Sequence, residues 1–321
     1  MTSRTPKIAL EEHFLAPGFE EYFETTAINI SPDLFGLAYD ALRDFDGRRI
    51  EAMDAVGVEL SILSLAGPGV QVERSSEIAI RKARDCNDFL AEKMAAQPRF
   101  GGLAHLAMQD PKAACVELER CITELGFQGV MINGQTNGVY LDDDRFSPFW
   151  ECAEALGAPV YIHPSNPPDV PYMYMNHPEL YGPVWSWMVE TGTHALRIIF
   201  GGVFDKYPKA KLVLGHMGET LPFQLWRFDS RWAISNAKGR TLEMQPSEYL
   251  KRNLWVTTSG VCSDEPLKCA LAALGEDRVL FSADYPFENI QAACDWIEEA
   301  DVSDATRSRI CSGNAKTLFG L

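Results

Sequence analysis

In Ile8-Ala9-Leu10-Glu11-Glu12-His13, a short apolar run ends in two carboxylates and an imidazole. Three later runs share this pattern: they are Pro159-Val160-Tyr161-Ile162-His163, Leu212-Val213-Leu214-Gly215-His216 and Val279-Leu280-Phe281-Ser282-Ala283-Asp284. Short apolar runs are typical of buried strands, and a polar residue just after the run lies at the strand's carboxyl end. Parallel barrels and open α/β sheets build their active sites at that end. The four endings therefore predict one converging site.

Strand and helix patterns alternate along the whole chain. Further strands are expected at 60–65, 100–106, 128–133 and 254–260, with helical segments between them. No G-x-G-x-x-G turn follows a strand, which argues against an open nucleotide-binding sheet. Eight strands separated by helices instead predict an α/β protein with a closed (β/α)8 barrel of the TIM type. We expect one domain over residues 1–321, with an irregular insertion at about 15–45 after the first strand.

Charge and composition exclude several classes of partner. The 321-residue chain has 29 Lys+Arg against 45 Asp+Glu, a formal net charge of −16, which repels phosphate backbones and argues against nucleic acid. No apolar segment is long enough for a membrane span, and the first residues lack a signal peptide's apolar stretch, so a cytoplasmic protein without a membrane partner is expected. The eight cysteines lack C-x-x-C spacing, which indicates reduced, mostly buried thiols.

Glu11 and His13 are two positions apart on a strand, so both side chains are expected to face the barrel lumen. Burying such groups is costly unless they are paired or bind a metal. With His163 and Asp284 they form a set of two imidazoles and two carboxylates, which suits Zn²⁺ or Mn²⁺ and leaves coordination for a substrate. The alternatives are an ion pair without metal at the barrel mouth, a structural His163, and an Asp284 that caps the next helix.

His216 and Glu219 form a second imidazole–carboxylate pair. A histidine beside a metal can act as acid, base or hydrogen-bond donor, with Glu219 fixing its tautomer, and a purely structural His216 is the alternative. Arg227, about two turns further on, can bind a substrate carboxylate in bidentate fashion or form a surface ion pair with Asp229. Of the remaining histidines, His177 and His194 are expected to be structural, whereas His105, at the end of the third strand, could line the lumen.

These motifs resemble the amidohydrolase superfamily, in particular its hydroxybenzoate decarboxylase branch, and within it the γ-resorcylate (2,6-dihydroxybenzoate) type. The resemblance covers nearly the whole chain through the motifs at 9–14, 161–164, 214–219, 257–260 and 284–288 and the tail at 314–319. Hydrolytic members usually begin with His-x-His, whereas this chain has Glu11 and His13. Residues 131–133 contain no lysine to bridge a second metal. Both departures favour a mononuclear decarboxylase.

The resemblance implies one divalent ion per subunit, Zn²⁺ or Mn²⁺, and no organic cofactor. It assigns metal ligation to Glu11, His13, His163 and Asp284, catalysis to Asp284, His216 and Glu219, and substrate binding to Arg227, Asn133 and Phe287. The expected reaction is the non-oxidative decarboxylation of an ortho-hydroxylated benzoate, with 2,6-dihydroxybenzoate giving resorcinol and CO₂. The relatives suggest a homo-oligomer, a dimer or a tetramer.

Two other functions are open at this point. A metal-dependent hydrolase of the same superfamily, such as a lactonase or ester hydrolase for an aromatic or pyrone acid, would use the ion to activate water, with Asp284 as base. A catalytically silent barrel would serve as a binding protein. Measuring CO₂ release from hydroxybenzoates separates the first alternative, and metal content after purification separates the second.

Overall fold

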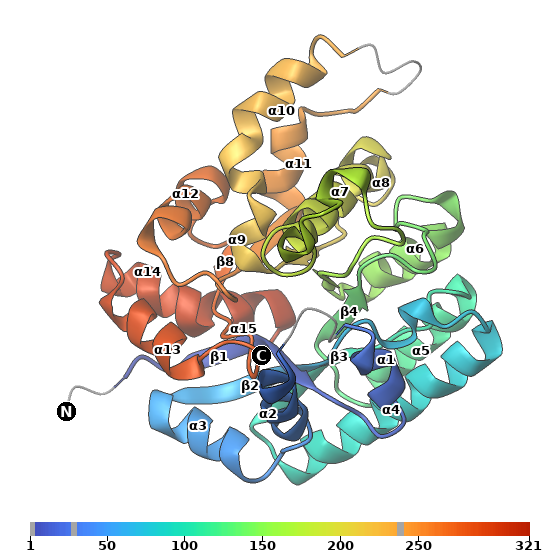
Figure 1. Cartoon of the computed structure of the whole chain (residues 1–321). Helices are drawn as coiled ribbons and strands as arrows, with labels where there is room; N and C mark the ends of the chain where they lie inside the picture. Colours follow the sequence, from blue (N-terminus) through green and yellow to red (C-terminus); the bar gives the residue numbers. More distant parts are fainter. Residues whose placement is uncertain (1–3, 27–30, 236–240) are drawn as a thin grey trace.

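Eight parallel strands form a barrel in chain order (Figure 1). The computed structural model describes residues 4–26, 31–235 and 241–321. The strands are β1 (Lys7–Phe14), β2 (Val58–Leu65), β3 (Phe100–Ala104), β4 (Gly129–Asn133), β5 (Val160–His163), β6 (Leu212–Leu214), β7 (Leu254–Thr257) and β8 (Val279–Leu280). Just beyond β8, Ser282 bridges Leu10 of β1, and the Leu10 N–H donates to the Phe281 carbonyl at 3.2 Å. This contact closes the barrel and confirms the predicted fold class.

Helices surround the strands and cover their outer face (Figure 1). They are α1 (Glu20–Glu24), α2 (Pro32–Leu42), α3 (Arg48–Val56), α4 (Ser76–Ala96), α5 (Pro111–Thr123), α6 (Ser147–Leu156), α7 (Ser186–Phe200), α8 (Val203–Lys206), α9 (His216–Glu219), α10 (Leu225–Trp232), α11 (Pro246–Asn253), α12 (Asp264–Leu274), α13 (Ile290–Glu299), α14 (Asp304–Ser308) and α15 (Asn314–Phe319). Helix α5 begins where the Asp110-Pro111 pair predicts a helix start. The Asp110 carboxylate accepts hydrogen bonds from the N–H groups of Lys112 and Ala113, both at 3.1 Å, and Pro111 is the first helical residue.

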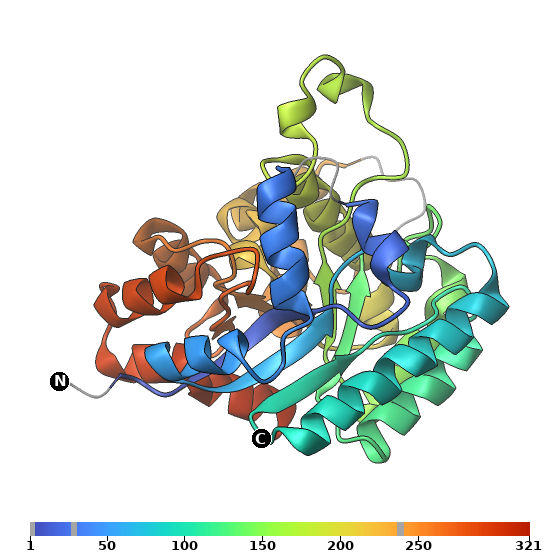
Figure 2. The same cartoon turned by 60° about the horizontal axis from the view of Figure 1, so that its bottom comes forward.

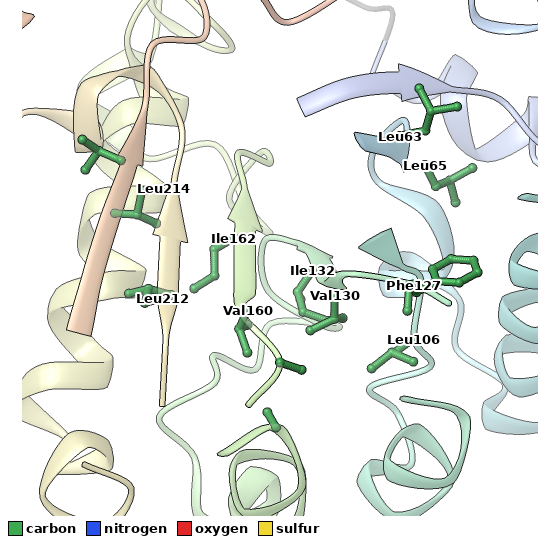
Figure 3. Packing of buried hydrophobic residues seen from close by; sticks show 14 of the residues in the cluster. Leu63, Leu65, Leu106, Phe127, Val130, Ile132, Val160, Ile162, Leu212 and Leu214 are labelled. Carbon is green, nitrogen blue, oxygen red and sulfur yellow. The ribbon is translucent and has the colours of Figure 1, made fainter. Parts of the chain in front are cut away.

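Side chains alternate along each strand between an outer and an inner apolar layer. The outer layer packs against the helices, and Figure 3 shows part of it, including Val130, Ile132, Val160, Ile162, Leu212 and Leu214. The inner layer fills the barrel with a separate cluster that contains Ile8, Leu10, Ile62, Leu103, Met131, Tyr161, Val213 and Leu280. Full burial of such side chains contributes roughly 2 kcal/mol each. The packed interior leaves the carboxyl ends of the strands as the place for a site.

The first strand contains an irregularity at the predicted ligands. The pairing register of β1 with β2 shifts between Ala9 and Glu12, and Glu11 has a left-handed φ of 56°. Strict alternation from the inward-facing Leu10 would turn Glu11 outward. The bulge instead lets Glu11 and His13 face the lumen, while Glu12 turns away and accepts the Ala283 N–H at 3.0 Å.

The segment after β1, predicted as an irregular insertion, contains the helices α1 and α2. Residues 27–30 of this insertion lie outside the described residues. Buried Arg49 links this segment to the barrel. Its guanidinium donates to the carbonyl of His13 on β1 at 2.6 Å and to those of Ala41 at 3.2 Å and Asp44 at 2.9 Å in the segment. In Figure 2, α2 and the chain between β5 and α7 rise from the same end of the barrel.

The cysteines are reduced, as the sequence predicts. All eight cysteines are free of disulfides, and Cys86, Cys121, Cys294 and Cys311 are buried. Burial raises the pKa of the Cys152 thiol to about 12, which makes it a poor nucleophile.

In the described part of the chain, no helix has the length and apolar character needed to cross a membrane.

Candidate metal centre and its cavity

The polar strand ends meet at the floor of one large cavity. The cavity has a volume of about 1110 Å³ and opens at the carboxyl ends of the strands. Its lining includes Asn133 after β4, His163 of β5, His216 after β6, and Asp284 and Phe287 after β8. Residues up to about 150 positions apart in the chain therefore share one floor, as the repeated strand pattern predicts.

Three of the predicted ligands lie close enough to hold one ion. The ligand atoms of Glu11, His13 and His163 all lie within 4.8 Å of one another, and all three side chains are buried. The imidazole rings of His13 and His163 meet edge to face at 4.8 Å. Asp284 adjoins this group, with its Oδ1 3.3 Å from His13 Nε2. The structure thus brings all four predicted ligands together.

The hydrogen bonds of the two imidazoles leave the same nitrogen free in each ring. His163 Nδ1 donates to the Pro164 carbonyl at 2.7 Å, and His13 Nδ1 lies 3.2 Å from Ser64 Oγ, so both Nε2 atoms face the centre. Burial lowers the pKa of His163 to about 3, which keeps its ring neutral with a free lone pair. Glu11 Oε1 and His13 Nε2 are buried without a hydrogen-bond partner. This donor set fits a divalent cation.

His216 lies in a strained turn directly after β6. Three non-glycine residues between positions 216 and 219 have left-handed φ values: 51° at His216, 55° at Met217 and 53° at Glu219. The turn places His216 Nδ1 2.7 Å from Glu219 Oε1. Although burial lowers the pKa of His216, the carboxylates of Glu219 and Glu11 raise it well above its ordinary value. This environment favours the imidazolium form of His216.

Asp284 faces that imidazolium. His216 Nε2 lies 3.8 Å from Asp284 Oδ2. Burial raises the pKa of the Asp284 carboxyl, but the adjacent imidazoles of His13 and His216 outweigh this effect and hold the pKa well below its ordinary value. The proton of the pair therefore resides on His216. Asp284 is not a helix cap, because the side chain of Asn289 caps α13 by accepting from the Ala292 N–H at 3.1 Å.

Two of the three predicted substrate-binding residues line the cavity. Asn133 is buried with its Oδ1 unpaired, and the Phe287 ring lies 5.5 Å from the His13 ring. The structure does not bring Arg227 to this site, since the residue is exposed on α10 and is absent from the cavity lining. Its alternative partner, Asp229, instead accepts hydrogen bonds from the N–H and hydroxyl of Ser247. Among the described lining residues there is no Lys or Arg.

The other three histidines make contacts away from the cavity, including His105, which the sequence left as a possible lumen residue. The Nε2 atoms of His105 and His194 accept the N–H groups of Val70 at 2.9 Å and Leu141 at 3.0 Å, and both rings are buried. His177 is exposed and pairs with Glu179 at 2.9 Å. None of the three reaches the cavity lining.

The hydroxyl groups that surround the Glu11 carboxylate were not predicted from the sequence. Tyr161 and Ser259 both donate to Glu11 Oε2, and Thr257 lies beside them. A side chain on Gly215 would occupy the carboxylate's position, since an added Cβ would lie 2.7 Å from Oε2. The available signal was the alternation of strand residues, which places Tyr161 on the same face as His163 two positions later.

The comparisons with known proteins agree with this geometry. A family model described as Amidohydrolase matches residues 40–321. The chain is 45% identical to the gamma-resorcylate decarboxylase of Polaromonas sp. strain JS666 over 328 residues, and the match covers 98% of each chain.

Two solved structures are similar over nearly the whole chain. One is a 2,6-dihydroxybenzoate decarboxylase complexed with 2,6-dihydroxybenzoate, at 40% identity and a TM-score of 0.93, covering 99% of this chain and 100% of that one. The other is a dihydroxybenzoic acid decarboxylase from Polaromonas sp. JS666 with bound manganese and the inhibitor 2-nitroresorcinol, at 44% identity and a TM-score of 0.93, covering 99% and 97%.

Proposed function

Because the chain belongs to the amidohydrolase family and to its hydroxybenzoate decarboxylase branch, we propose that it converts 2,6-dihydroxybenzoate to resorcinol and CO₂. The protein is a metal-dependent decarboxylase, and residues 1–321 act as one domain. The observation that supports decarboxylation is the position of the Asp284 carboxylate between the candidate ligand His13 and His216. A proton source thus lies directly beside the candidate ion site.

Glu11, His13, His163 and Asp284 would hold one divalent ion, Mn²⁺ or Zn²⁺. The buried and unpaired Glu11 Oε1 and His13 Nε2, with the His163 side chain close to both, support this assignment. When bound, the ion supplies positive charge for the substrate's carboxylate and ortho-hydroxyl oxygens. Since no Lys or Arg lines the described cavity, the subunit's own side chains offer His216 alone as a cationic partner for that anion.

Asp284 transfers a proton to the ring carbon that bears the carboxylate. The proton comes from His216, whose Nε2 faces Asp284 Oδ2, and Glu219 holds the imidazole in the required tautomer through Nδ1. Protonation of that carbon interrupts the aromatic ring. The bond to the carboxyl carbon then breaks, its electron pair restores the aromatic system, and CO₂ leaves. This reaction requires no oxidant and no organic cofactor.

Asn133 and Phe287 are the proposed substrate-binding residues of the same subunit. The unpaired Asn133 Oδ1 can accept a hydrogen bond from a phenolic hydroxyl, and Phe287 provides an aromatic face beside His13. Both features suit a small hydroxylated ring.

The protein is further proposed to form a homo-oligomer, a dimer or tetramer, in which Arg227 binds substrate in a neighbouring copy. Arg227 is exposed beside Phe223 and Trp226, whose side chains are 78% and 77% exposed, as is usual for residues that pack against a partner. Arg227→Met should raise KM, whereas Arg231→Met on the same helix should not. Equal KM values for both variants, or a monomer in light scattering, would reject this proposal.

Incubation with a panel of acids separates this function from the hydrolase alternative. The manganese-loaded protein should release CO₂ and one equivalent of resorcinol from 2,6-dihydroxybenzoate, and turn over 2,3- and 2,4-dihydroxybenzoate, salicylate and 5-carboxyvanillate more slowly or not at all. Hydrolysis of a pyrone lactone or an aromatic ester without CO₂ release from any member of the panel would favour the hydrolase.

A further inference from the structure

Three hydroxyl groups surround one oxygen of the Glu11 carboxylate. They belong to Tyr161 on β5, Thr257 on β7 and Ser259 just after β7, and we call them the hydroxyl cluster. Tyr161 Oη and Ser259 Oγ each donate to Glu11 Oε2. Thr257 Oγ1 lies 2.9 Å from both of these hydroxyls and 3.5 Å from Oε2. All three side chains are buried, so no bulk water competes for these bonds.

The two oxygens of Glu11 therefore have different surroundings. Oε2 accepts hydrogen bonds from the hydroxyls of Tyr161 and Ser259. Oε1 has no hydrogen-bond partner and lies 3.8 Å from His163 Nε2, on the side of the other candidate ligands. The hydroxyls of Tyr161 and Ser259 both donate to Oε2, and Thr257 Oγ1 lies within hydrogen-bond distance of both hydroxyls and of Oε2.

Two further contacts restrict this carboxylate. Gly215 leaves the space that it occupies, since a Cβ there would lie 2.7 Å from Oε2 and 3.0 Å from Oε1. Ser259 Oγ also accepts the backbone N–H of His216 at 3.1 Å. One hydroxyl thus contacts both the metal-binding carboxylate and the turn that carries the catalytic imidazole.

We propose that the hydroxyl cluster positions Glu11 so that Oε1 alone is its metal-binding oxygen, and that Ser259 couples this carboxylate to the placement of His216. Tyr161 and Ser259 are positioning residues, because neither reaches the cavity. The inference rests on the proposed metal site but not on the identity of the substrate. Loss of a hydrogen-bond partner that orients a ligand typically weakens metal affinity about 10- to 100-fold.

The test measures Mn²⁺ binding to the metal-free full-length protein by competition with a fluorescent chelator. Tyr161→Phe removes one donor to Oε2 and is expected to weaken Mn²⁺ binding about 10- to 100-fold and to change the Mn²⁺ electron paramagnetic resonance spectrum. Ser259→Ala is expected to weaken binding similarly and, in addition, to lower kcat at saturating Mn²⁺. In Tyr161→Phe the loss should lie mainly in Mn²⁺ affinity.

Tyr249→Phe is the matched control. Tyr249 is equally buried, and its hydroxyl donates to Asp205 on α8 at a position outside the cavity lining. This variant should lose stability yet keep the wild-type Mn²⁺ affinity and spectrum. If Tyr161→Phe does not fold, Thr257→Val replaces it, because this substitution removes a cluster hydroxyl with little change of shape.

The outcomes separate the inference from the proposed function. Wild-type Mn²⁺ affinity and spectrum in Tyr161→Phe or Thr257→Val, with a wild-type protein that binds Mn²⁺ and releases CO₂, would overturn the positioning role alone. Equal losses of affinity in Tyr161→Phe and Tyr249→Phe would also overturn it, since they would reflect general destabilisation. A wild-type protein that binds no Mn²⁺ would overturn the proposed metal site and the inference with it.

Discussion

His216 Nδ1 and Glu219 Oε1 lie 2.7 Å apart within one turn after β6. The contact fixes which imidazole nitrogen faces the cavity, and Nε2 consequently lies 3.8 Å from Asp284. The same carboxylate helps to raise the pKa of His216 well above its ordinary value, although burial alone would lower it. One hydrogen bond therefore orients the ring of the proposed proton source and also favours its protonated form.

Removing the charge of Glu219 tests this relationship. Glu219→Gln keeps an oxygen acceptor for Nδ1 but no longer stabilises the imidazolium, so kcat should fall at least about tenfold with unchanged metal content. Resorcinol formation at saturating Mn²⁺ measures kcat, and elemental analysis measures the metal. Glu179→Gln is the control, because Glu179 forms a comparable pair with the exposed His177 at 2.9 Å. Equal kcat in the two variants would remove Glu219 from the mechanism.

Asp284→Asn tests the transfer of the proton to the ring. The amide cannot carry the proton, so kcat is expected to fall about 10³-fold or more, since a positioned acid or base contributes roughly 10²–10⁴-fold. Asp295→Asn, which alters an exposed carboxylate paired with Arg4, should be active. A near-normal rate in Asp284→Asn would exclude Asp284 as the proton donor.

Gly215→Ala tests the space that the metal-binding carboxylate needs. The new Cβ would lie 2.7 Å from Glu11 Oε2, a contact that forces the carboxylate or β6 to move, and Mn²⁺ affinity should fall at least about tenfold. The same change at Gly36 in α2 meets no atom within 4 Å and should leave Mn²⁺ binding intact while stabilising the helix by roughly 0.5–1 kcal/mol. Chelator competition and urea unfolding measure the two effects. Wild-type affinity in Gly215→Ala would contradict the close packing of the site.

Buried histidines predict a loss of stability in mild acid. Burial lowers the pKa of His105 and of His194 to about 3 in the folded protein, whereas the unfolded value is near 6.5. The unfolded state therefore binds more protons below pH 6.5. The contribution of each neutral ring is complete above that pH and declines as the pH falls from 6.5 towards 3, by about 2 kcal/mol per histidine at pH 5.

Urea unfolding of the metal-free protein at pH 7 and pH 5 measures this loss. His194→Gln should show a smaller difference between the two pH values than the wild type, by about 2 kcal/mol. His177→Gln, which changes an exposed ring, is the control and should behave as the wild type. A difference between pH 7 and pH 5 that is identical in His194→Gln and in the wild type would show that the buried ring does not titrate in this range.

Much of the site could be predicted because the residues at which a strand ends can be recognised from the local sequence. The runs that end at His163 and Asp284 have the apolar lengths of strands, and the geometry of a parallel barrel alone then brings their ends together. Helix starts such as Asp110-Pro111 are likewise local. These features need no knowledge of tertiary contacts.

The remaining features depend on contacts between distant segments. Alternation correctly placed Glu11 and His13 on one face, but the bulge that turns this face towards the lumen arises from pairing with β2 and carries no signal in the local pattern. The contact of Tyr161 with Glu11 spans 150 positions of the chain. The exposed position of Arg227 likewise follows from how α10 lies on the barrel, which its helical pattern does not fix.

The proposed decarboxylase depends on one metal ion per subunit. This dependence is measured by titrating the metal-free protein with Mn²⁺ while resorcinol formation from 2,6-dihydroxybenzoate is followed. Without metal the protein should be inactive, and the rate should rise linearly with added Mn²⁺ and reach its plateau at one equivalent per subunit. Resorcinol formation by the metal-free protein, a plateau only at two equivalents, or no resorcinol at any Mn²⁺ concentration would contradict it.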